Sequence, residues 1–202
     1  ATIEGNLAGI LRAERTALNF LQRMSGVATA THAMIERISG LPSLIVDTRK
    51  TIPGWRALDK YAVRMGGGHN HRMNLSDGVL IKDNHITAMA EFGINLYDLI
   101  LLAKTNAPHT VRIEVEVETL EQAEEALAAG ADILMLDNMD LPTMRTVVQM
   151  SKGKAITEAS GGITLETVRN VAETGVNLIS VGSITHSTKA LDINLEILGE
   201  KR

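Results

Sequence analysis

Basic side chains are concentrated in one stretch of an otherwise acidic chain. Between Arg49 and Lys82 the sequence carries a net charge of +5, whereas the whole chain of 202 residues has a formal net charge of −4. A local excess of positive charge in an acidic protein indicates an anionic ligand bound at one place. Nucleic acid is a poor candidate, because the overall charge has the wrong sign and only Trp55 and Tyr61 in this stretch could stack on bases. A small anion with several charges fits better.

Carboxylates recur with a period of two further along the chain. Glu114, Glu116 and Glu118 alternate with Ile113, Val115 and Val117, so one face of a strand would carry all three carboxylates. A half-exposed strand with one wet face would explain them. In a parallel sheet both faces are covered, and a buried carboxylate without a partner is costly. At least one should then meet a cation, hydroxyl groups or a basic side chain, with Glu116 and Glu118 favoured over Glu114 because they lie nearer the strand end.

Two glycine-containing loops follow late strand candidates. Ser160-Gly161-Gly162 precedes a predicted helix, and Gly182-Ser183 follows the last apolar run. Glycine lets backbone N–H groups approach an anion, and late loops of βα barrels often hold phosphate. Each glycine segment alone is typical of an ordinary turn. Two in successive loops predict a phosphate site.

Lys82 ends an apolar run and allows three interpretations. It could be a lysine whose amine reaches water at the rim of a barrel, a desolvated Schiff-base lysine, or a cation paired with an anionic substrate. His71 and Arg72 are adjacent, which suits a loop in which both side chains reach one anion. The histidines show no metal-ligand spacing, so a zinc site is not expected.

Hydrophobic periodicity predicts a long helical segment followed by alternating strands and helices. Helical spacing extends over residues 6–39, and Pro53 opens a helix through Val63. Further strands are predicted at 44–47, 79–82, 111–117, 133–136, 155–158 and 178–181, and further helices at 96–105, 120–129, 141–151 and 165–174. Thr119 and Gln122 form a capping-box pattern, and Gly130 and Gly175 stand where helix C-caps belong.

Strands that alternate with helices imply a parallel sheet, either wound flat or closed into a barrel. Nearly every predicted strand is followed by polar side chains such as Asp47, Glu116 and Asp137. In a barrel these strand ends meet on one face, whereas in a flat sheet they do not form a ring. The barrel is therefore favoured, and residues 1–202 are predicted to form one domain.

Composition narrows the class of protein. The chain is 45% hydrophobic but only 2% aromatic and has no cysteine, which excludes disulfides and thiolate sites and suits a cytoplasmic protein. No apolar run approaches the roughly 20 residues of a membrane helix, and no signal-peptide pattern stands at the start. The first residue is Ala1, and helical spacing begins almost at once, so we expect a part of a longer protein.

Taken together, several segments resemble the quinolinate phosphoribosyltransferase family, also called nicotinate-nucleotide pyrophosphorylase (carboxylating). They cover almost the whole chain: Glu14-Arg-Thr-Ala-Leu-Asn-Phe20, Asp47-Thr-Arg-Lys-Thr-Ile-Pro-Gly54, Gly66-Gly-Gly-His-Asn-His-Arg72, Leu80-Ile-Lys-Asp-Asn-His85, Glu114-Val-Glu116, Leu136-Asp-Asn138, Glu158-Ala-Ser-Gly-Gly162 and Val181-Gly182. The resemblance implies an open, seven-stranded, parallel α/β barrel of TIM-like form after a long N-terminal helical segment. The small N-terminal α/β domain of the family has no counterpart here.

The resemblance also implies a reaction. Quinolinate and phosphoribosyl pyrophosphate would give nicotinate mononucleotide, pyrophosphate and CO2 with Mg²⁺, a step of NAD biosynthesis. The implied catalytic residues are Lys50, Lys82, Glu116 and Asp137. The implied substrate-binding set adds Arg15, Thr48, Arg49, His71, Arg72, Ser160, Gly161, Gly162, Gly182 and Ser183.

Within that set the resemblance assigns roles. Arg49, His71, Arg72 and Lys82 would bind the quinolinate carboxylates, and Lys50 the pyrophosphate. Glu116 and Asp137 would hold ribose hydroxyls and, through water, Mg²⁺, while the glycine loops would hold the 5′-phosphate. Arg15 would enter the site of a neighbouring subunit, so a homodimer or a dimer-based oligomer is implied, without nucleic acid or membrane partners.

Three alternatives remain open at this point. A paralogous family associated with molybdenum transport shares part of the pattern but departs around Lys82, where Ile81-Lys-Asp-Asn-His85 is intact here. A Schiff-base aldolase using Lys82 and a non-catalytic barrel that binds phosphate are the other two.

Overall fold

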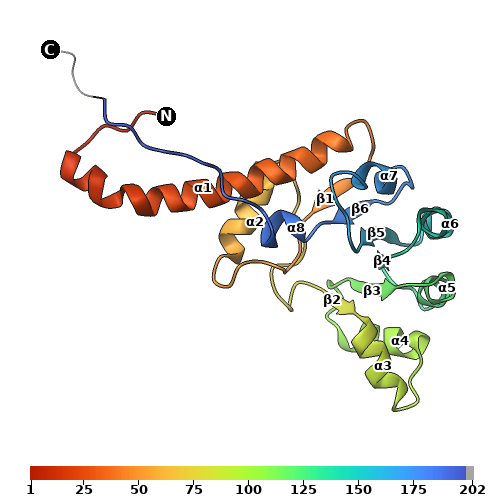
Figure 1. The fold of residues 1–202 in the computed structure, drawn as a ribbon. Helices are drawn as coiled ribbons and strands as arrows, with labels where there is room; N and C mark the ends of the chain where they lie inside the picture. The colour runs from red at the N-terminus through yellow and green to blue at the C-terminus, as the bar shows by residue number, and fades with distance from the viewer. Residues whose placement is uncertain (199–202) are drawn as a thin grey trace.

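The fold is a parallel α/β sheet that curves into an open arc (Figure 1). The computed structural model describes residues 1–198. Its strands are β1 (Leu44–Val46), β2 (Val79–Ile81), β3 (Ile113–Val117), β4 (Ile133–Asp137), β5 (Ile156–Ser160) and β6 (Leu178–Ser180). They pair in the order β1-β6-β5-β4-β3-β2, and every pair is parallel. All six strands were predicted from the sequence, with bounds that differ by up to two residues.

Helices connect these strands and cover the convex side of the arc (Figure 1). They are α1 (Leu7–Arg37), α2 (Arg56–Met65), α3 (Asp83–Ala90), α4 (Leu96–Asn106), α5 (Leu120–Ala128), α6 (Leu141–Ser151), α7 (Val168–Ala172) and α8 (Ser183–His186). The sequence predicted six of the eight. It missed α3 and α8, which lie directly behind strand ends, and it made α7 too long, since only Val168–Ala172 is helical.

Local sequence signals explain where the helices begin and end. The Thr119 side chain accepts a hydrogen bond from the Gln122 backbone at 3.2 Å, while the Gln122 side chain reaches back to the Glu118 backbone N–H at 2.8 Å. The predicted capping box is therefore present with one difference: the Gln122 side chain binds the N–H of Glu118 and not that of the N-cap residue Thr119. Gly130 and Gly175 have φ of 78° and 89°, the left-handed conformation that ends a helix most easily with glycine.

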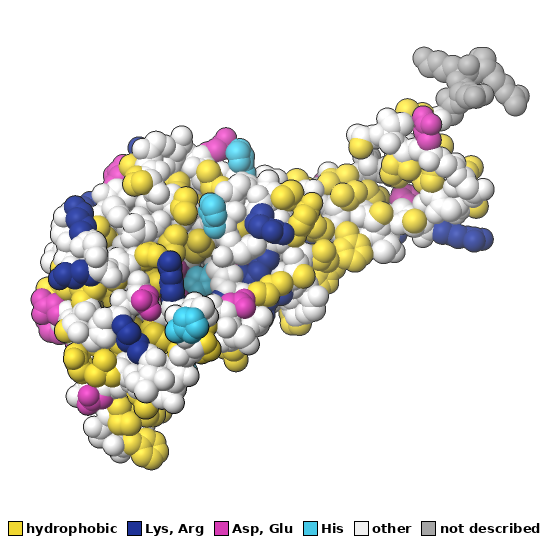
Figure 2. Space-filling model, turned by 180° about the vertical axis from the view of Figure 1, so that it is seen from behind, with side chains coloured by type: hydrophobic (Ala, Val, Ile, Leu, Met, Phe, Trp, Pro, Cys, Tyr) yellow, Lys and Arg dark blue, Asp and Glu magenta, His cyan; other side chains and the backbone are white. Residues whose placement is uncertain are grey.

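Helix α1 is longer than the body that it packs on. Its C-terminal half contacts β1, α2, α7 and α8, where Val27 and Met34 are buried. Its N-terminal half projects beyond the body beside the C-terminal segment, to which Gln22 is hydrogen-bonded (Figure 1). This projecting arm exposes apolar side chains, among them Leu7, Leu11 and Leu21 (Figure 2).

The seventh strand implied by the family resemblance is not confirmed, since the described residues form six strands, in a sheet that stays open. The next segment after β1 and α2 pairs with β1 only at a single bridge between His69 and Val46. The chain then turns away, because Asn70 and the His71 backbone N–H both bind the Asp47 carboxylate instead of continuing a ladder. The arc stays open between this bridge and β2.

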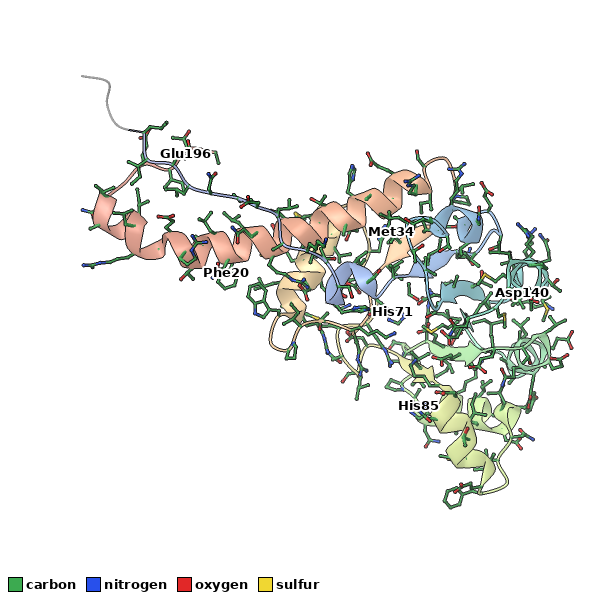
Figure 3. The ribbon with its side chains drawn as sticks, in the orientation of Figure 1. Phe20, Met34, His71, His85, Asp140 and Glu196 are labelled. Carbon is green, nitrogen blue, oxygen red and sulfur yellow. The ribbon has the colours of Figure 1, made fainter. Side chains whose placement is uncertain are left out.

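Strand register decides which side chains enter the concave side. Glu114 pairs with Ile133, and Glu116 pairs with Met135, which in turn pairs with Glu158. Paired residues of parallel strands share a face, so these carboxylates point to one side. His71 contacts Glu114 and Glu158 from inside the arc, which identifies that side as concave (Figure 3). The opposite face carries Leu134 and Leu136, both fully buried under the helices.

Candidate active site

Helix α2 holds two cationic loops at the carboxyl end of β1. Arg56 donates to the Arg49 carbonyl at 3.2 Å and to the Met73 carbonyl at 3.2 Å, so it ties the two loops together. Asp59 is fully buried, where it pairs with Arg23 of α1 at 3.0 Å and accepts from the Ile52 N–H at 3.3 Å. These contacts fix the backbone on either side of Lys50.

Asp47 holds the loop of residues 70 and 71 in place at the carboxyl end of β1. It is fully buried and forms an ion pair with Lys60, and it accepts hydrogen bonds from Asn70 Nδ2 at 2.6 Å and the His71 N–H at 2.9 Å. Burial raises the pKa of Asp47, and the bond and charge of Lys60 only partly offset that rise. Lys60 also donates to the His71 carbonyl at 2.9 Å.

These contacts divide the basic side chains between residues 49 and 82 into those that bind other parts of the protein and those that remain available to a ligand. Arg56 and Lys60 are used inside the protein, and Arg64 lies over the Tyr61 ring at 5.9 Å. The cations left to face a ligand are fewer than the sequence suggested. They are Arg49, Lys50, Arg72 and Lys82.

Arg49 and Arg72 bring two guanidinium groups to the same place. Burial lowers the pKa of Arg72, the charge of Arg49 lowers it further, and Glu114 acts in the opposite direction. Arg49 Nε is buried without a hydrogen-bond partner in the part of the chain that the structure describes. Arg72 Nη1 donates to the Gly78 carbonyl at 3.1 Å. Two neighbouring guanidinium groups with unused donors form a site for a planar, doubly charged anion.

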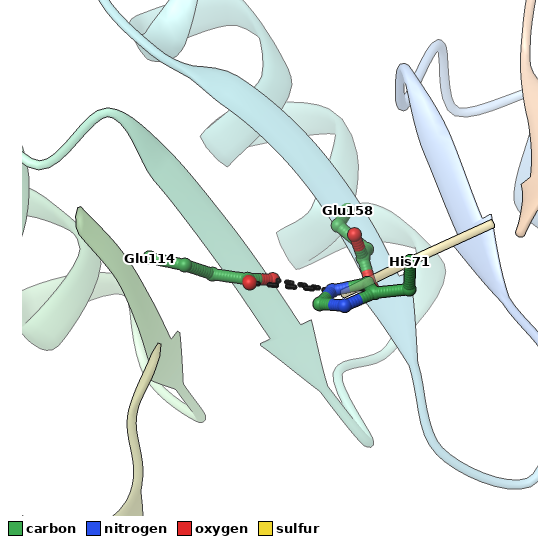
Figure 4. A group of neighbouring side chains, drawn as sticks. All are labelled: His71, Glu114 and Glu158. Carbon is green, nitrogen blue, oxygen red and sulfur yellow. Dashed lines mark hydrogen bonds and ion pairs between the residues drawn. The ribbon is translucent and has the colours of Figure 1, made fainter. Parts of the chain in front are cut away.

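His71 lies beneath this pair, and each of its polar groups has a protein partner. Its N–H binds Asp47, its carbonyl accepts from Lys60, and its Nδ1 accepts from the Arg72 N–H at 2.8 Å. Its Nε2 lies 3.3 Å from Glu114 Oε2 and 3.5 Å from Glu158 Oε1 (Figure 4). Burial alone lowers the pKa of His71, but the bond to Glu114 and the two carboxylate charges outweigh it and raise the pKa.

Glu158 is the most deeply buried carboxyl group on the concave side. Its side chain is 1% exposed, and neither oxygen has a hydrogen-bond partner among residues 1–198. Burial first, and then the charge of Glu114, raise the pKa of Glu158 from its ordinary value to about 7, while His71 acts in the opposite direction. The three groups of this buried cluster, His71, Glu114 and Glu158, have ligand atoms within 4.8 Å of one another.

Lys82, Glu116 and Asp137 follow on the next strand ends. Lys82 Nζ lies 2.5 Å from Glu116 Oε2, and the Lys82 side chain is 45% exposed. A Schiff-base lysine needs an apolar pocket, so an exposed amine paired with a carboxylate does not favour that interpretation. Asp137 ends β4, and its Oδ2 accepts from its neighbour Asn138 at 2.7 Å. Glu118 is exposed beyond the strand.

A cavity of about 690 Å³ lies between the carboxyl ends of β5 and β6 and helix α1. Its wall contains the predicted phosphate residues together with Thr48 and Lys50: Ser160, Gly161, Gly162, Gly182 and Ser183. Gly161 has φ of 94°, and a Cβ there would lie 2.2 Å from Asn138 Oδ1. Only glycine fits this position, where the backbone turns past β4 and faces the cavity.

Comparison with known proteins identifies the arrangement. A family model described as the C-terminal domain of quinolinate phosphoribosyl transferase matches residues 27–196. The chain belongs to the quinolinate phosphoribosyltransferase family. It is 48% identical over 197 residues, 98% of this chain and 67% of the relative, to the probable nicotinate-nucleotide pyrophosphorylase (carboxylating) of Bacillus subtilis.

Other members of the family share the same fold. The chloroplastic nicotinate-nucleotide pyrophosphorylase (carboxylating) of Arabidopsis thaliana is 45% identical over 212 residues, 96% of this chain and 60% of that protein. The crystal structure of NadC from Streptococcus pyogenes superposes with a TM-score of 0.88 at 45% identity, covering 93% of this chain and 65% of that one. The chain thus spans about three fifths to two thirds of the length of the curated relatives it matches.

The structure gathers most of the family's expected site residues, with one exception. Arg15 is exposed on the projecting arm, away from the concave side of its own sheet. His85 (Figure 3) accepts the Lys82 N–H at 2.9 Å in the cap of α3. His186 lies on the cavity wall next to Gly182.

Sequence reasoning assigned His71 of the buried cluster to the site but not its two carboxylates. Glu114 was ranked below Glu116 and Glu118, and Glu158 was noted as a strand end and as part of a family segment, without a role. The signal was present in both cases, since a carboxylate inside a parallel strand needs a partner. Within residues 1–198, no helix is long and apolar enough to cross a bilayer.

Proposed function

We propose that this chain transfers the phosphoribosyl group of phosphoribosyl pyrophosphate to quinolinate and releases CO2, giving nicotinate mononucleotide and pyrophosphate in NAD biosynthesis. One observation carries the proposal. Arg49 and Arg72 are neighbouring guanidinium groups with unused donors, and the chain neighbours of Arg49, Thr48 and Lys50, line a glycine-containing cavity of about 690 Å³. The Glu116 carboxylate and Asp137 lie at neighbouring strand ends. A planar diacid and a sugar phosphate each have a matching part of this site.

Quinolinate binds at the cationic side. Arg49 and Arg72 supply planar forks of donors for its two carboxylates, and Lys82 supplies a point charge at the rim. The Lys82–Glu116 ion pair holds that ammonium group in place before the substrate arrives. His71, which the family resemblance places among the carboxylate ligands, has no polar group left for this task.

Phosphoribosyl pyrophosphate binds at the other side. The glycine loops after β5 and β6 direct backbone N–H groups to its 5′-phosphate, and Lys50, exposed on the same cavity wall, binds the pyrophosphate. Glu116 and Asp137 accept hydrogen bonds from the ribose hydroxyls. These carboxylates also fit Mg²⁺, which prefers hard oxygen donors, takes few protein ligands and keeps several waters. Bound there, Mg²⁺ would neutralise charge on the pyrophosphate.

Catalysis rests on positioning and electrostatics, without a covalent intermediate on the enzyme. The quinolinate ring nitrogen attacks C1 of the ribose while the bond to pyrophosphate breaks, and the carboxylates of Glu116 and Asp137 stabilise the positive charge that develops on the sugar. The positive ring nitrogen then withdraws electrons from the adjacent carbon–carboxylate bond. CO2 leaves with that bond broken, and the ring carbon takes up one proton.

The active form is a dimer in this proposal. Arg15 projects from an arm whose apolar side chains, including Leu7, Leu11 and Leu21, are exposed in the single chain. A second copy that covered this surface would receive Arg15 at its own site. Burial of several leucines would stabilise such a contact by about 1.5–3 kcal/mol for each fully covered side chain.

The test is formation of nicotinate mononucleotide from the two substrates with Mg²⁺, measured on this chain and on a longer version that carries the family's N-terminal domain. We expect product from both, with a lower rate for the present chain if that domain completes the site. Absence of product from both versions, under conditions in which each remains folded, would overturn the proposed function. Turnover of quinolinate would also exclude an aldolase that uses Lys82.

A further inference from the structure

The hydrogen bonds of His71 determine which of its ring nitrogens carries a proton. A backbone N–H can donate only to a nitrogen with a free lone pair, and the Arg72 N–H lies 2.8 Å from Nδ1. The neutral ring therefore carries its proton on Nε2, which points to Glu114 and Glu158 (Figure 4). Nothing polar on His71 is directed to the space above, where a ligand would bind.

The same tautomer argues against a metal ion in the buried cluster. One histidine and two glutamates within 4.8 Å are a possible ligand set. Coordination through Nε2 would move the ring proton to Nδ1, where it would face the Arg72 N–H at 2.8 Å. Two donors opposed at hydrogen-bond distance repel each other, so the cluster as built binds a proton at Nε2 and not a cation.

We propose that His71 is a positioning residue for the substrate-binding Arg72, and that Glu114 and Glu158 hold His71 in the orientation this requires. The inference rests on the proposed function, because it assigns Arg72 to the quinolinate carboxylates. His71 Nδ1 fixes the backbone of Arg72, and the Gly78 carbonyl fixes one end of its side chain at 3.1 Å. Arg72 is therefore held at its backbone N–H and at one guanidinium nitrogen, with its other guanidinium N–H groups left for the anion.

A pair of substitutions separates this role from direct contact with the substrate. In His71→Asn, the side-chain oxygen can occupy the place of Nδ1 and accept the Arg72 N–H, but nothing replaces Nε2. In His71→Gln, the amide reaches the place of Nε2 and the acceptor at Nδ1 is lost. The two variants therefore remove opposite halves of the ring.

We expect the KM for quinolinate to stay within about threefold of wild type in His71→Asn and to rise about tenfold in His71→Gln, as the loss of one hydrogen bond implies. The KM for phosphoribosyl pyrophosphate should not change in either variant. The reverse order, with Gln active and Asn impaired, would mean that Nε2 itself contacts the substrate and would overturn the proposal.

A double substitution tests whether His71 acts through Arg72. If it does, adding His71→Gln to Arg72→Ala should raise the KM for quinolinate no further than Arg72→Ala alone. Independent, additive losses would show a role for His71 that does not pass through Arg72 and would contradict the proposal.

A measurement on the unaltered protein avoids any dependence on the stability of a variant. In protein labelled with ¹⁵N, a scalar coupling across the hydrogen bond should connect the Arg72 amide nitrogen to an unprotonated histidine Nδ1. Absence of that coupling, or zinc bound at one equivalent in the purified protein, would overturn the inference. Absence of turnover with the coupling present would count against the proposed function alone, so the two failures are distinguishable.

Discussion

Replacing Glu158 with Gln should stabilise the protein at neutral pH. Glu158 is fully buried, and burial together with Glu114 raises the pKa of its carboxyl group to about 7 in the folded protein. In the unfolded chain the same group ionises near its ordinary value of about 4.5. Between these two values the unfolded state loses its proton while the folded state keeps it, so stability falls as the pH rises. A glutamine cannot ionise and avoids this loss.

The size of the effect follows from the two pKa values. The interval between about 4.5 and about 7 corresponds to about 3 kcal/mol of unfolding free energy. The advantage of Glu158→Gln over wild type should be absent below pH 4.5, grow up to pH 7 and stay constant above that. The charge of Glu158 also raises the pKa of His71, and its removal lowers that pKa again, so 3 kcal/mol is an upper value.

Urea unfolding at a series of pH values measures this difference directly. The matched control is Glu124→Gln, because Glu124 is exposed on α5 and its substitution should leave the difference from wild type nearly independent of pH. An advantage of Glu158→Gln that did not grow between pH 4.5 and 7 would refute the reasoning, since it would mean that the buried carboxyl group ionises as easily as an exposed one.

Three further substitutions test the site and its scaffold. Arg72→Ala should weaken quinolinate binding about 100-fold or more in a calorimetric titration and leave phosphoribosyl pyrophosphate binding largely intact, because one half-buried fork of donors is lost; equal loss of both ligands would contradict its role. Asp137→Asn should lower turnover more than quinolinate affinity, and unchanged turnover in a steady-state assay would remove Asp137 from the site. Lys60→Met should cost about 3–5 kcal/mol in urea unfolding, because it leaves Asp47 buried without its cation, whereas Lys152→Met on the surface should have almost no effect.

β1, β2, β4 and β6 were predictable as apolar runs, and β3 by the alternation of Glu114 and Glu116 with apolar residues. Both faces of a parallel sheet are covered, so runs such as Ile133–Asp137 are hydrophobic almost throughout and easy to recognise. Helices with a wide apolar stripe, such as α6, were predicted with the same bounds that the structure shows. Apolar runs and apolar helix stripes are set by residues close together in the sequence, so they can be recognised without the structure.

The elements that were missed or wrong depend on contacts distant in sequence. Helix α3 buries no side chain fully and begins within the Lys82 segment, so it has little hydrophobic periodicity to detect. The seventh strand fails because Asp47 binds the backbone and side chain of residues 70 and 71, which takes that segment away from β1. No pattern within the segment itself announces a partner 23 or 24 residues earlier.

The functional side chains show the same division. The sequence predicted that Arg49, Lys60 and Arg72 belong to one cationic stretch. It could not distinguish Lys60, which pairs with Asp47, from Arg49 and Arg72, which keep donors without a carboxylate partner in the described residues. That distinction requires knowing the partner of each cation, and for Lys60 the partner is Asp47, which follows β1 directly and lies 13 residues away in the sequence.

The buried carboxylates explain why so much positive charge can be held ready in the absence of substrate. Arg49 and Arg72 repel each other, and the lowered pKa of Arg72 records that repulsion together with burial. Glu114 lies close enough to counter it and at the same time accepts the His71 proton that fixes Arg72. The Glu114 carboxylate thus offsets part of the positive charge of Arg49 and Arg72. In the proposed function the guanidinium donors that have no protein partner remain available to the anion. Removing Glu114 would therefore disturb the electrostatics and the geometry of Arg72 together, whereas His71→Gln leaves the Glu114 carboxylate in place. The difference between the two variants measures how much of the binding is due to that carboxylate.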